Sequence, residues 1–224
     1  MSAFVNVKAL VLRSVAYKES SRILTVLTDT EGKLTVSAQG AMRKNSRVAS
    51  VVQPLVLSEM TLSKNRDRYT LTEAHVIEQF AELSLDLSRF ALAAYLAEML
   101  EAVSDADSPS AELLSLGLNA LHVLASSGKS EAIVKSAFEL RLMCLAGYEP
   151  MVEDGAVHGG DFERKVDADT AAAVRYIADC DAKKLYKFDM EKPDALARVA
   201  EDYVTAQLER RFGALDYYKS VRNK

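Results

Sequence analysis

The sequence contains little of what several large protein classes require. It holds two cysteines, Cys144 and Cys180, and no CxxC pair. Two thiols in 224 residues exclude a disulfide framework, leave too few ligands for a cysteine-based zinc site, and fit a reducing compartment. No run approaches the ~18 uninterrupted apolar residues of a membrane-spanning helix, and residues 1–8 lack the pattern of a signal peptide. We therefore expect a cytoplasmic protein without a membrane partner.

Signatures of catalysis are also missing. Neither GxSxG nor HExxH occurs, and the glycines of residues 155–160 lack the strand, lysine and Ser/Thr that a phosphate-binding P-loop needs. His158 has carboxylates nearby, but a metal site needs three or four convergent ligands. The three histidines stand far apart in the sequence: His75, His122 and His158. We predict no enzyme activity, no cofactor and no bound metal.

Charge is distributed unevenly along the chain. The formal net charge of −4 by itself disfavours nucleic acid as a partner. Residues 1–80, however, carry 11 Lys and Arg against 7 Asp and Glu, a balance of +4, which leaves −8 for residues 81–224. A basic first third joined to an acidic remainder indicates two parts with different partners.

The first 80 residues have the pattern of short strands. Val-rich, partly alternating runs separated by turns predict five strands, at residues 4–15, 22–28, 34–38, 55–62 and 69–76. Gly32 supplies the positive φ of a hairpin turn, and Pro54 stands at a strand start, where proline is tolerated. Five strands in about 75 residues fit a small closed barrel, of either the OB or the SH3-like type.

Helical periodicity replaces this pattern after residue 80. Helices are predicted at residues 90–100, 111–125, 130–146, 167–180 and 195–212, with a short one around Leu185. The glycine-rich, polar stretch of residues 149–166 predicts a loop. Strands followed by helices give an α+β fold with two segregated parts, which we place at residues 1–80 and 81–224.

Residues 40–47 form a basic loop between two predicted strands. Arg43, Lys44 and Arg47 lie within five positions, follow Gly40, and have no acid among them. Guanidinium and ammonium groups on a turn suit phosphate oxygens. Taken alone, the loop fits an ordinary solvated turn better than a phosphate-binding site, and the sequence on both sides shifts that balance.

Arg141 is the unusual residue of the helical part. Leu140 and Leu142 flank it within a mostly apolar helix end, and an unpaired buried guanidinium is costly. It either pairs with an acid or lines a groove that receives an anionic partner.

Several segments in order resemble one family. Residues 10–14 (LVLRS), 17–25 (YKESSRILT), 40–47 (GAMRKNSR), 53–54 (QP), 138–148 (FELRLMCLAGY) and 217–220 (YYKS) together look like the RecO recombination-mediator family over nearly the whole chain. The resemblance implies an N-terminal five-stranded OB-fold barrel and a C-terminal α-helical domain. It also implies a non-enzymatic DNA repair protein, associated with the nucleoid, that binds single- and double-stranded DNA, anneals strands, and helps load RecA on SSB-coated gaps. The implied partners are RecR, the acidic C-terminal tail of SSB, and RecA.

The resemblance suggests roles for particular residues. Arg43, Lys44 and Arg47 match the family's basic loop and become expected phosphate contacts, and Arg141 becomes the expected contact of the SSB tail. We expect the other DNA-binding cations on the barrel, at Lys8, Arg13, Arg22, Lys33, Arg66 and Arg68. Aromatic residues are few there, namely Phe4, Tyr17, Tyr69 and Phe80, so electrostatics should dominate over base stacking.

One feature departs from the family. Many members carry a four-cysteine zinc module after the Gly-Tyr pair, but here residues 155–159 (GAVHG) hold the place of the first CxxCG and the second pair is missing. We therefore predict a shortened loop and no structural zinc. The alternative to DNA binding is a barrel-plus-helices adaptor that binds protein partners only, and a hydrolase using carboxylates of the helical part is a third interpretation without a motif.

Overall fold

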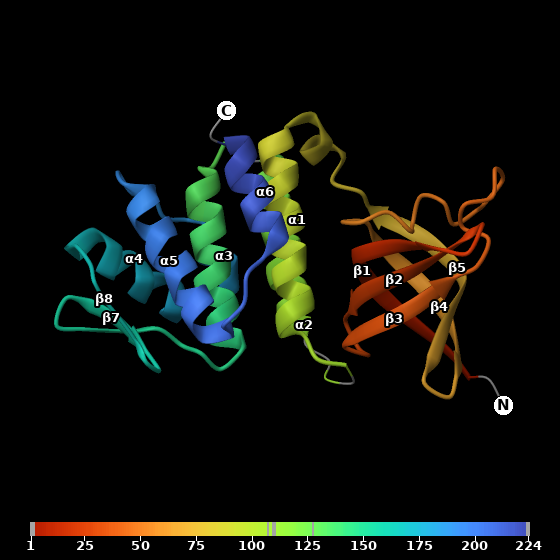
Figure 1. Cartoon of the computed structure of the whole chain (residues 1–224), viewed down its shortest axis with the longest axis horizontal. Helices are drawn as coiled ribbons and strands as arrows, with labels where there is room; N and C mark the ends of the chain where they lie inside the picture. Colours follow the sequence, from red (N-terminus) through yellow and green to blue (C-terminus); the bar gives the residue numbers. More distant parts are fainter. Residues whose placement is uncertain (1–2, 107, 109–110, 127, 223–224) are drawn as a thin grey trace.

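The computed structural model describes residues 3–106, 108, 111–126 and 128–222, and it has a barrel at one end and a helical part at the other (Figure 1). The barrel strands are β1 (Ala3–Tyr17), β2 (Ser21–Thr28), β3 (Lys33–Ala38), β4 (Leu57–Asn65) and β5 (Arg68–Glu78). They close in the order β1-β2-β3-β5-β4, with β3 and β5 parallel and the other neighbours antiparallel. This closed five-stranded arrangement confirms the OB-fold expectation and excludes the SH3-like alternative.

The middle of strand β1, residues 9–12, is apolar on both faces because both faces are covered there. Val7, Ala9 and Val11 belong to the buried cluster inside the barrel, whereas Leu10 and Leu12 belong to the cluster that the helices form. A strand covered on two sides reads as a continuous apolar run rather than a strict alternation. The outer side of β1 is therefore the surface on which the helical part rests.

The helical part consists of six α-helices and two short 3₁₀ helices within the described residues. They are η1 (Ala81–Leu85), α1 (Leu87–Val103), α2 (Ala111–Ser126), α3 (Glu131–Leu145), α4 (Ala168–Asp179), η2 (Ala182–Lys184), α5 (Pro193–Leu208) and α6 (Gly213–Arg222). Figure 1 shows α1 and α2 nearest the barrel, with α6 along α1 and with α3, α5 and α4 farther away. The strands-then-helices architecture confirms the predicted α+β class. No helix in the described part of the chain is long and apolar enough to cross a membrane.

Residues 149–166 differ from the loop that their glycines predicted. They form a small antiparallel sheet of β6 (Met151–Glu153), β7 (Ala156–Gly159) and β8 (Phe162–Lys165). Asp154 and Gly155 both have positive φ, 48° and 73°, which is the two-residue hairpin turn that Asp-Gly favours. Counting the glycines as loop formers missed this hairpin signal.

The last predicted helix, residues 195–212, ends earlier than expected, and a separate helix follows it. Helix α5 ends where Glu209 adopts a left-handed φ of 48°, and α6 begins at Gly213. The left-handed residue reverses the chain so that α6 returns along α1. Residues 195–212 therefore do not form one continuous helix.

Candidate nucleic-acid interface

The exposed outer face of the barrel is formed by the second half of β1 with β2 and β3. Arg13 pairs with Thr25, which pairs with Thr35, and two residues further along β1 Val15 pairs with Ile23. Directly opposed residues share a face, and Arg13 Nη2 donates to Thr25 Oγ1 at 3.2 Å. The β2–β3 face of an OB barrel, with its β1–β2 and β4–β5 loops, is the surface that binds oligonucleotides.

The basic loop lies at one end of this face, against the β1–β2 turn. Met42 N donates to Ser20 O at 3.0 Å, and Gly40 N donates to Ser21 Oγ at 3.4 Å. Arg22 reaches Met42 Sδ at 3.8 Å and donates from Nε to Ser14 Oγ at 2.6 Å. These contacts hold the start of the loop beside the strands that form the face.

Arg43, Lys44 and Arg47 are all exposed, and none has a side-chain hydrogen bond or ion pair within the described residues. Their backbone is nevertheless folded, because Arg43 N donates to Gly40 O at 3.1 Å and Ser46 N donates to Arg43 O at 3.0 Å. Buried apolar residues on both sides of the three cations fix the loop to the barrel: Ala41, Val51 and Val52. The three charges are thus carried by an anchored segment and have no acid to neutralise them.

A cleft of about 370 Å³ separates the face from the helical part and contains two more predicted cations. Arg13 Nε lies 3.0 and 3.1 Å from the two carboxylate oxygens of Glu101, near the end of α1. The hydrogen bond to Glu101, and then its negative charge, raise the pKa of Arg13. Lys33 Nζ donates to the backbone oxygen of Glu101 at 2.7 Å. Arg13 and Lys33 are therefore engaged by α1.

Arg66 and Arg68 flank the β4–β5 turn beside this cleft. Both are exposed and have no side-chain partner in the described part of the chain, and Asp67 between them lines the cleft. Arg66 and Arg68 therefore place two further positive charges on the β4–β5 turn, beside the cleft.

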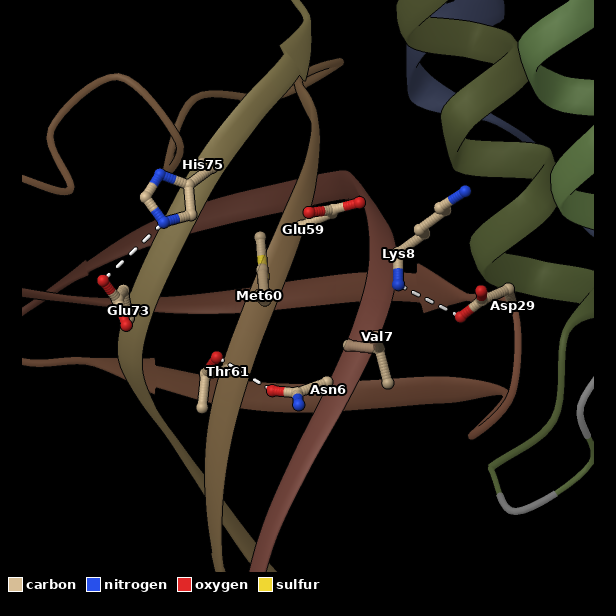
Figure 2. A pocket seen from close by; sticks show the side chains of 9 residues that line it. All are labelled: Asn6, Val7, Lys8, Asp29, Glu59, Met60, Thr61, Glu73 and His75. Carbon is tan, nitrogen blue, oxygen red and sulfur yellow. Dashed lines mark hydrogen bonds and ion pairs between the residues drawn. The ribbon is translucent and has the colours of Figure 1, made fainter.

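Lys8 lies elsewhere on the barrel. It lines a hollow of about 440 Å³ over β1, β4 and β5, together with the carboxylates of Asp29, Glu59 and Glu73 (Figure 2). Glu73 also pairs with His75 at 3.6 Å. The local balance of charge around Lys8 is negative, which sets it apart from the cations near the β2–β3 face.

The aromatic residues divide into buried and exposed pairs. Tyr69 and Phe80 are 7% and 3% exposed, whereas Phe4 and Tyr17 are 66% and 48% exposed. Tyr17 ends β1 on the β2–β3 side, paired with Ser21, and Lys18 Nζ lies 5.3 Å from its ring centroid. The sequence named Tyr17 as one of the few aromatic residues of the barrel, but neither Tyr17 nor Lys18 was among the predicted DNA-binding residues.

Arg141 joins α3 to the end of α4. Its Nη1 donates to the backbone oxygen of Ala178 at 2.8 Å, and the side chain is half-buried. The last carbonyls of a helix lack intrahelical partners and favour a nearby cation. The pairing partner is thus a helix end, which neither of the two sequence-based alternatives named.

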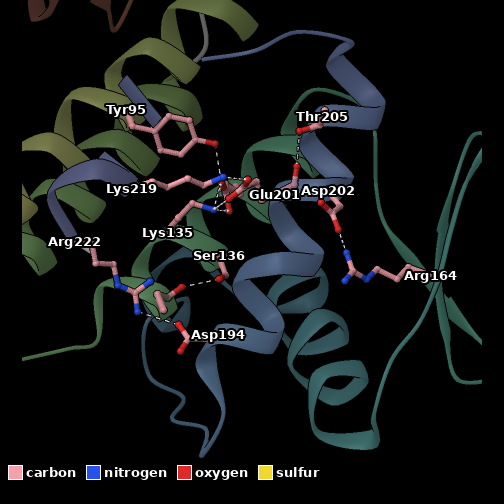
Figure 3. A network of polar contacts seen from close by, with 12 residues as sticks. Tyr95, Lys135, Ser136, Arg164, Asp194, Glu201, Asp202, Thr205, Lys219 and Arg222 are labelled. Atoms are coloured by element: carbon pink, nitrogen blue, oxygen red, sulfur yellow. Dashed lines mark hydrogen bonds and ion pairs between the residues drawn. The ribbon is translucent and has the colours of Figure 1, made fainter. Parts of the chain in front are cut away.

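A buried ionic network in the helical part was not found from the sequence. Lys135 Nζ lies 2.7 Å from Glu139 Oε1 and 3.3 Å from Glu201 Oε2, and Tyr95 donates to Glu139 at 2.6 Å. Figure 3 shows Tyr95, Lys135, Glu201 and Lys219 converging from α1, α3, α5 and α6. Burial raises the pKa of Glu139 against the opposing effect of Lys135. The i,i+4 spacing of Lys135 and Glu139 was the only local signal, and it is shared by solvated pairs.

The network borders a groove of about 470 Å³ between α5 and α6 that is rich in cations. Its lining includes Lys135, Arg198, Lys219 and Arg222, against the acids Asp194 and Glu201. The described residues contain no group of three or more His, Cys, Asp or Glu side chains placed to hold a metal ion.

The chain matches two family models and several curated relatives. The models are "Recombination protein O N terminal" over residues 1–80 and "Recombination protein O C terminal" over residues 84–216. The DNA repair protein RecO of Acetivibrio thermocellus is 28% identical over 244 residues, covering 97% of each chain. The RecO proteins of Desulforamulus reducens and Caldicellulosiruptor saccharolyticus are 37% and 24% identical, over 70% and 98% of this chain and 61% and 99% of their own lengths. The two models together span nearly all of the sequence, and the chain belongs to the RecO family of DNA repair proteins.

Proposed function

We propose that this protein is a non-enzymatic recombination mediator that binds single- and double-stranded DNA along the β2–β3 face of its barrel. The observation that carries the proposal is the anchored basic loop, whose Arg43, Lys44 and Arg47 are exposed and unneutralised beside the oligonucleotide-binding face of an OB barrel. Arg22 contacts Met42 in the basic loop, and Arg66 and Arg68 supply cations at the β4–β5 loop. Lys8, among its carboxylates, contributes least.

Binding of this kind depends on phosphate neutralisation. Tyr17 is the exposed aromatic residue on the face, so stacking is limited and sequence preference should be slight. The acidic helical part repels phosphates and confines DNA to the barrel. Neutralised phosphates reduce the repulsion between two complementary strands, and bases that the protein does not contact remain free to pair. This is the physical basis of the proposed strand annealing.

The partners follow from the family. We propose that the protein acts in the cytoplasm, on the nucleoid, with RecR, to help RecA load on gaps coated with SSB. Arg141 is the proposed contact of the acidic SSB tail, because Ala178 occupies only one of the five N–H donors of its guanidinium. The groove between α5 and α6 is a second candidate for the tail, although Lys219 and Arg222 already pair there with Glu201 and Asp194.

The test of DNA binding is the salt dependence of single-strand affinity. Replacing Arg43, Lys44 and Arg47 by Ala should reduce the slope of log K against log salt by roughly 0.7 for each phosphate that is no longer neutralised, about 2 in total. The matched control removes three exposed lysines of the helical part and the same net charge: Lys183→Ala, Lys184→Ala and Lys187→Ala. Equal slopes in the two triple variants would contradict the proposal.

Annealing and partner binding need separate assays. Complementary strands precoated with SSB should anneal faster with this protein than without it. If neither annealing nor a gel shift at low salt is observed while partner proteins bind, the protein-only adaptor is the better description. A tail peptide that binds Arg141→Ala as tightly as the unchanged protein would remove Arg141 from the site, and the Lys219→Ala, Arg222→Ala variant then tests the groove.

A further inference from the structure

Glu101 occupies the position at which a phosphate of the proposed DNA strand would meet Arg13. Its carboxylate accepts from Arg13 Nε at 3.0 and 3.1 Å and lies 2.8 Å from Arg13 Nη2. Arg13 Nη2 also donates to Thr25 Oγ1, which ties the guanidinium to β2. A carboxylate held this way presents two oxygens to the same edge of the guanidinium that a phosphate uses.

The helical part holds Glu101 firmly in this position. The chain that follows α1 runs beside the start of β3, where Lys33 N donates to Asp105 O at 3.2 Å and Gly32 pairs with Ala106. A side chain at residue 32 would be crowded, because a Cβ there would lie 3.0 Å from backbone atoms of Ser108. This close approach fixes the end of α1 against the barrel.

The two cations that Glu101 engages are held differently. Lys33 donates to the backbone oxygen of Glu101, which is one of the last carbonyls of α1. A cation is favoured there by the helix end and does not depend on the Glu101 side chain. Arg13 is held by the carboxylate itself and by one hydrogen bond to Thr25 Oγ1, and its side chain remains 57% exposed. Glu101 is 26% exposed, but the open side of Arg13 lets water, salt and a phosphate oxygen reach the guanidinium and compete with the carboxylate. A phosphate of a DNA strand can therefore bind Arg13 by displacing the Glu101 carboxylate.

We propose that Glu101 is a resident competitor for phosphate that limits how tightly the barrel holds a single strand. This inference rests on the proposed function. With Glu101 in place, Arg13 is oriented but already neutralised, and a strand gains this contact only by displacing the carboxylate. A protein that anneals strands has to release the product, and a competitor built into the interface keeps the bound state short-lived.

The test compares single-strand binding by the unchanged protein and by Glu101→Gln. The amide keeps the size and an acceptor oxygen but removes the charge, so Arg13 is released to phosphate. We expect affinity to rise roughly two- to fivefold, in line with the small value of one exposed ion pair. We expect the salt slope to steepen by about 0.7, the value of one single-strand contact. Dissociation of the annealed product should slow in proportion.

Two controls separate this role from general effects of charge. Glu73→Gln removes the same charge from the hollow over β1, β4 and β5, where Glu73 is 69% exposed, and should leave the salt slope unchanged. In a protein that already carries Arg13→Gln, adding Glu101→Gln should bring no gain in affinity, because the cation that it releases is gone. A general gain in positive charge would raise affinity for Glu73→Gln, and for Glu101→Gln both in the unchanged protein and in the Arg13→Gln protein.

The possible failures are distinguishable. If the unchanged protein does not bind a single strand at low salt, the proposed function itself fails. If it binds, but Glu101→Gln binds no more tightly or gains as much without Arg13, the DNA-binding proposal stands and the role of Glu101 is refuted.

Discussion

Neutralising either member of the buried Lys135–Glu139 pair should destabilise the helical part by about 3 kcal/mol or more. The two side chains are 3% and 0% exposed, and Lys135 Nζ lies 2.7 and 3.0 Å from the two carboxylate oxygens. Removing one partner of a buried pair costs about 3–5 kcal/mol, because the other charge stays buried. Glu139→Gln leaves Lys135 with Glu201 at 3.3 Å, so its cost should lie near the lower figure.

Lys135→Met should make stability depend on pH. Burial already raises the pKa of Glu139, and Lys135 opposes that rise. Without the lysine, the folded-state pKa rises further above the unfolded value of about 4.3. The folded state then binds the proton more tightly, so stability is greatest below the unfolded pKa and is lost as pH rises through the folded pKa, at up to about 1.4 kcal/mol per pH unit. We expect the variant to be less stable at pH 7 than at pH 5.

Urea unfolding followed by far-ultraviolet circular dichroism measures these costs in the helical part. The double variant Lys135→Met, Glu139→Gln removes both charges and keeps an acceptor for the Tyr95 hydroxyl. It should cost no more than about 1–2 kcal/mol, less than either single variant, because an uncharged replacement leaves no buried charge unpaired. Single-variant costs that simply add, to within about 0.5 kcal/mol, would refute the reasoning.

Three further predictions test individual positions. Gly159→Ala places a methyl group against the buried Tyr203 ring and should cost about 1–3 kcal/mol in urea unfolding, whereas Gly128→Ala, with nothing within 4 Å, should change little. Asp86→Ala removes the acceptor of two N–H groups in the first turn of α1 and should cost about 1 kcal/mol by the same assay, most of which Asp86→Asn restores. Burial raises the pKa of Cys144 from 9.0 to about 11, so its alkylation at pH 8 should be roughly a hundredfold slower in the folded than in the urea-unfolded protein, and the folded-state rate should increase as pH rises toward 11.

Some of these features were accessible from the sequence and some were not. The strand and helix positions follow from residue periodicity, and the concentration of charge in residues 43–47 is visible without a fold. The small sheet of β6, β7 and β8 was missed because its glycines were counted without the Asp-Gly turn signal between two alternating runs. The break at Glu209 had no clear local signal, since a left-handed glutamate is set by the return of α6 along α1.

The sequence by itself determined the five barrel strands and most of the helices, the family to which the chain belongs, and the sign of the charge on each part. These properties depend on residues near one another in the chain. The tertiary structure alone decided that β3 pairs in parallel with β5, that Arg13 meets Glu101 across 88 residues, and that Lys135 and Glu139 are buried rather than solvated. The physical reason is that closing the barrel and packing the helices on it bury apolar faces that are distant in the sequence. Only this packing brings a charged side chain beside its partner.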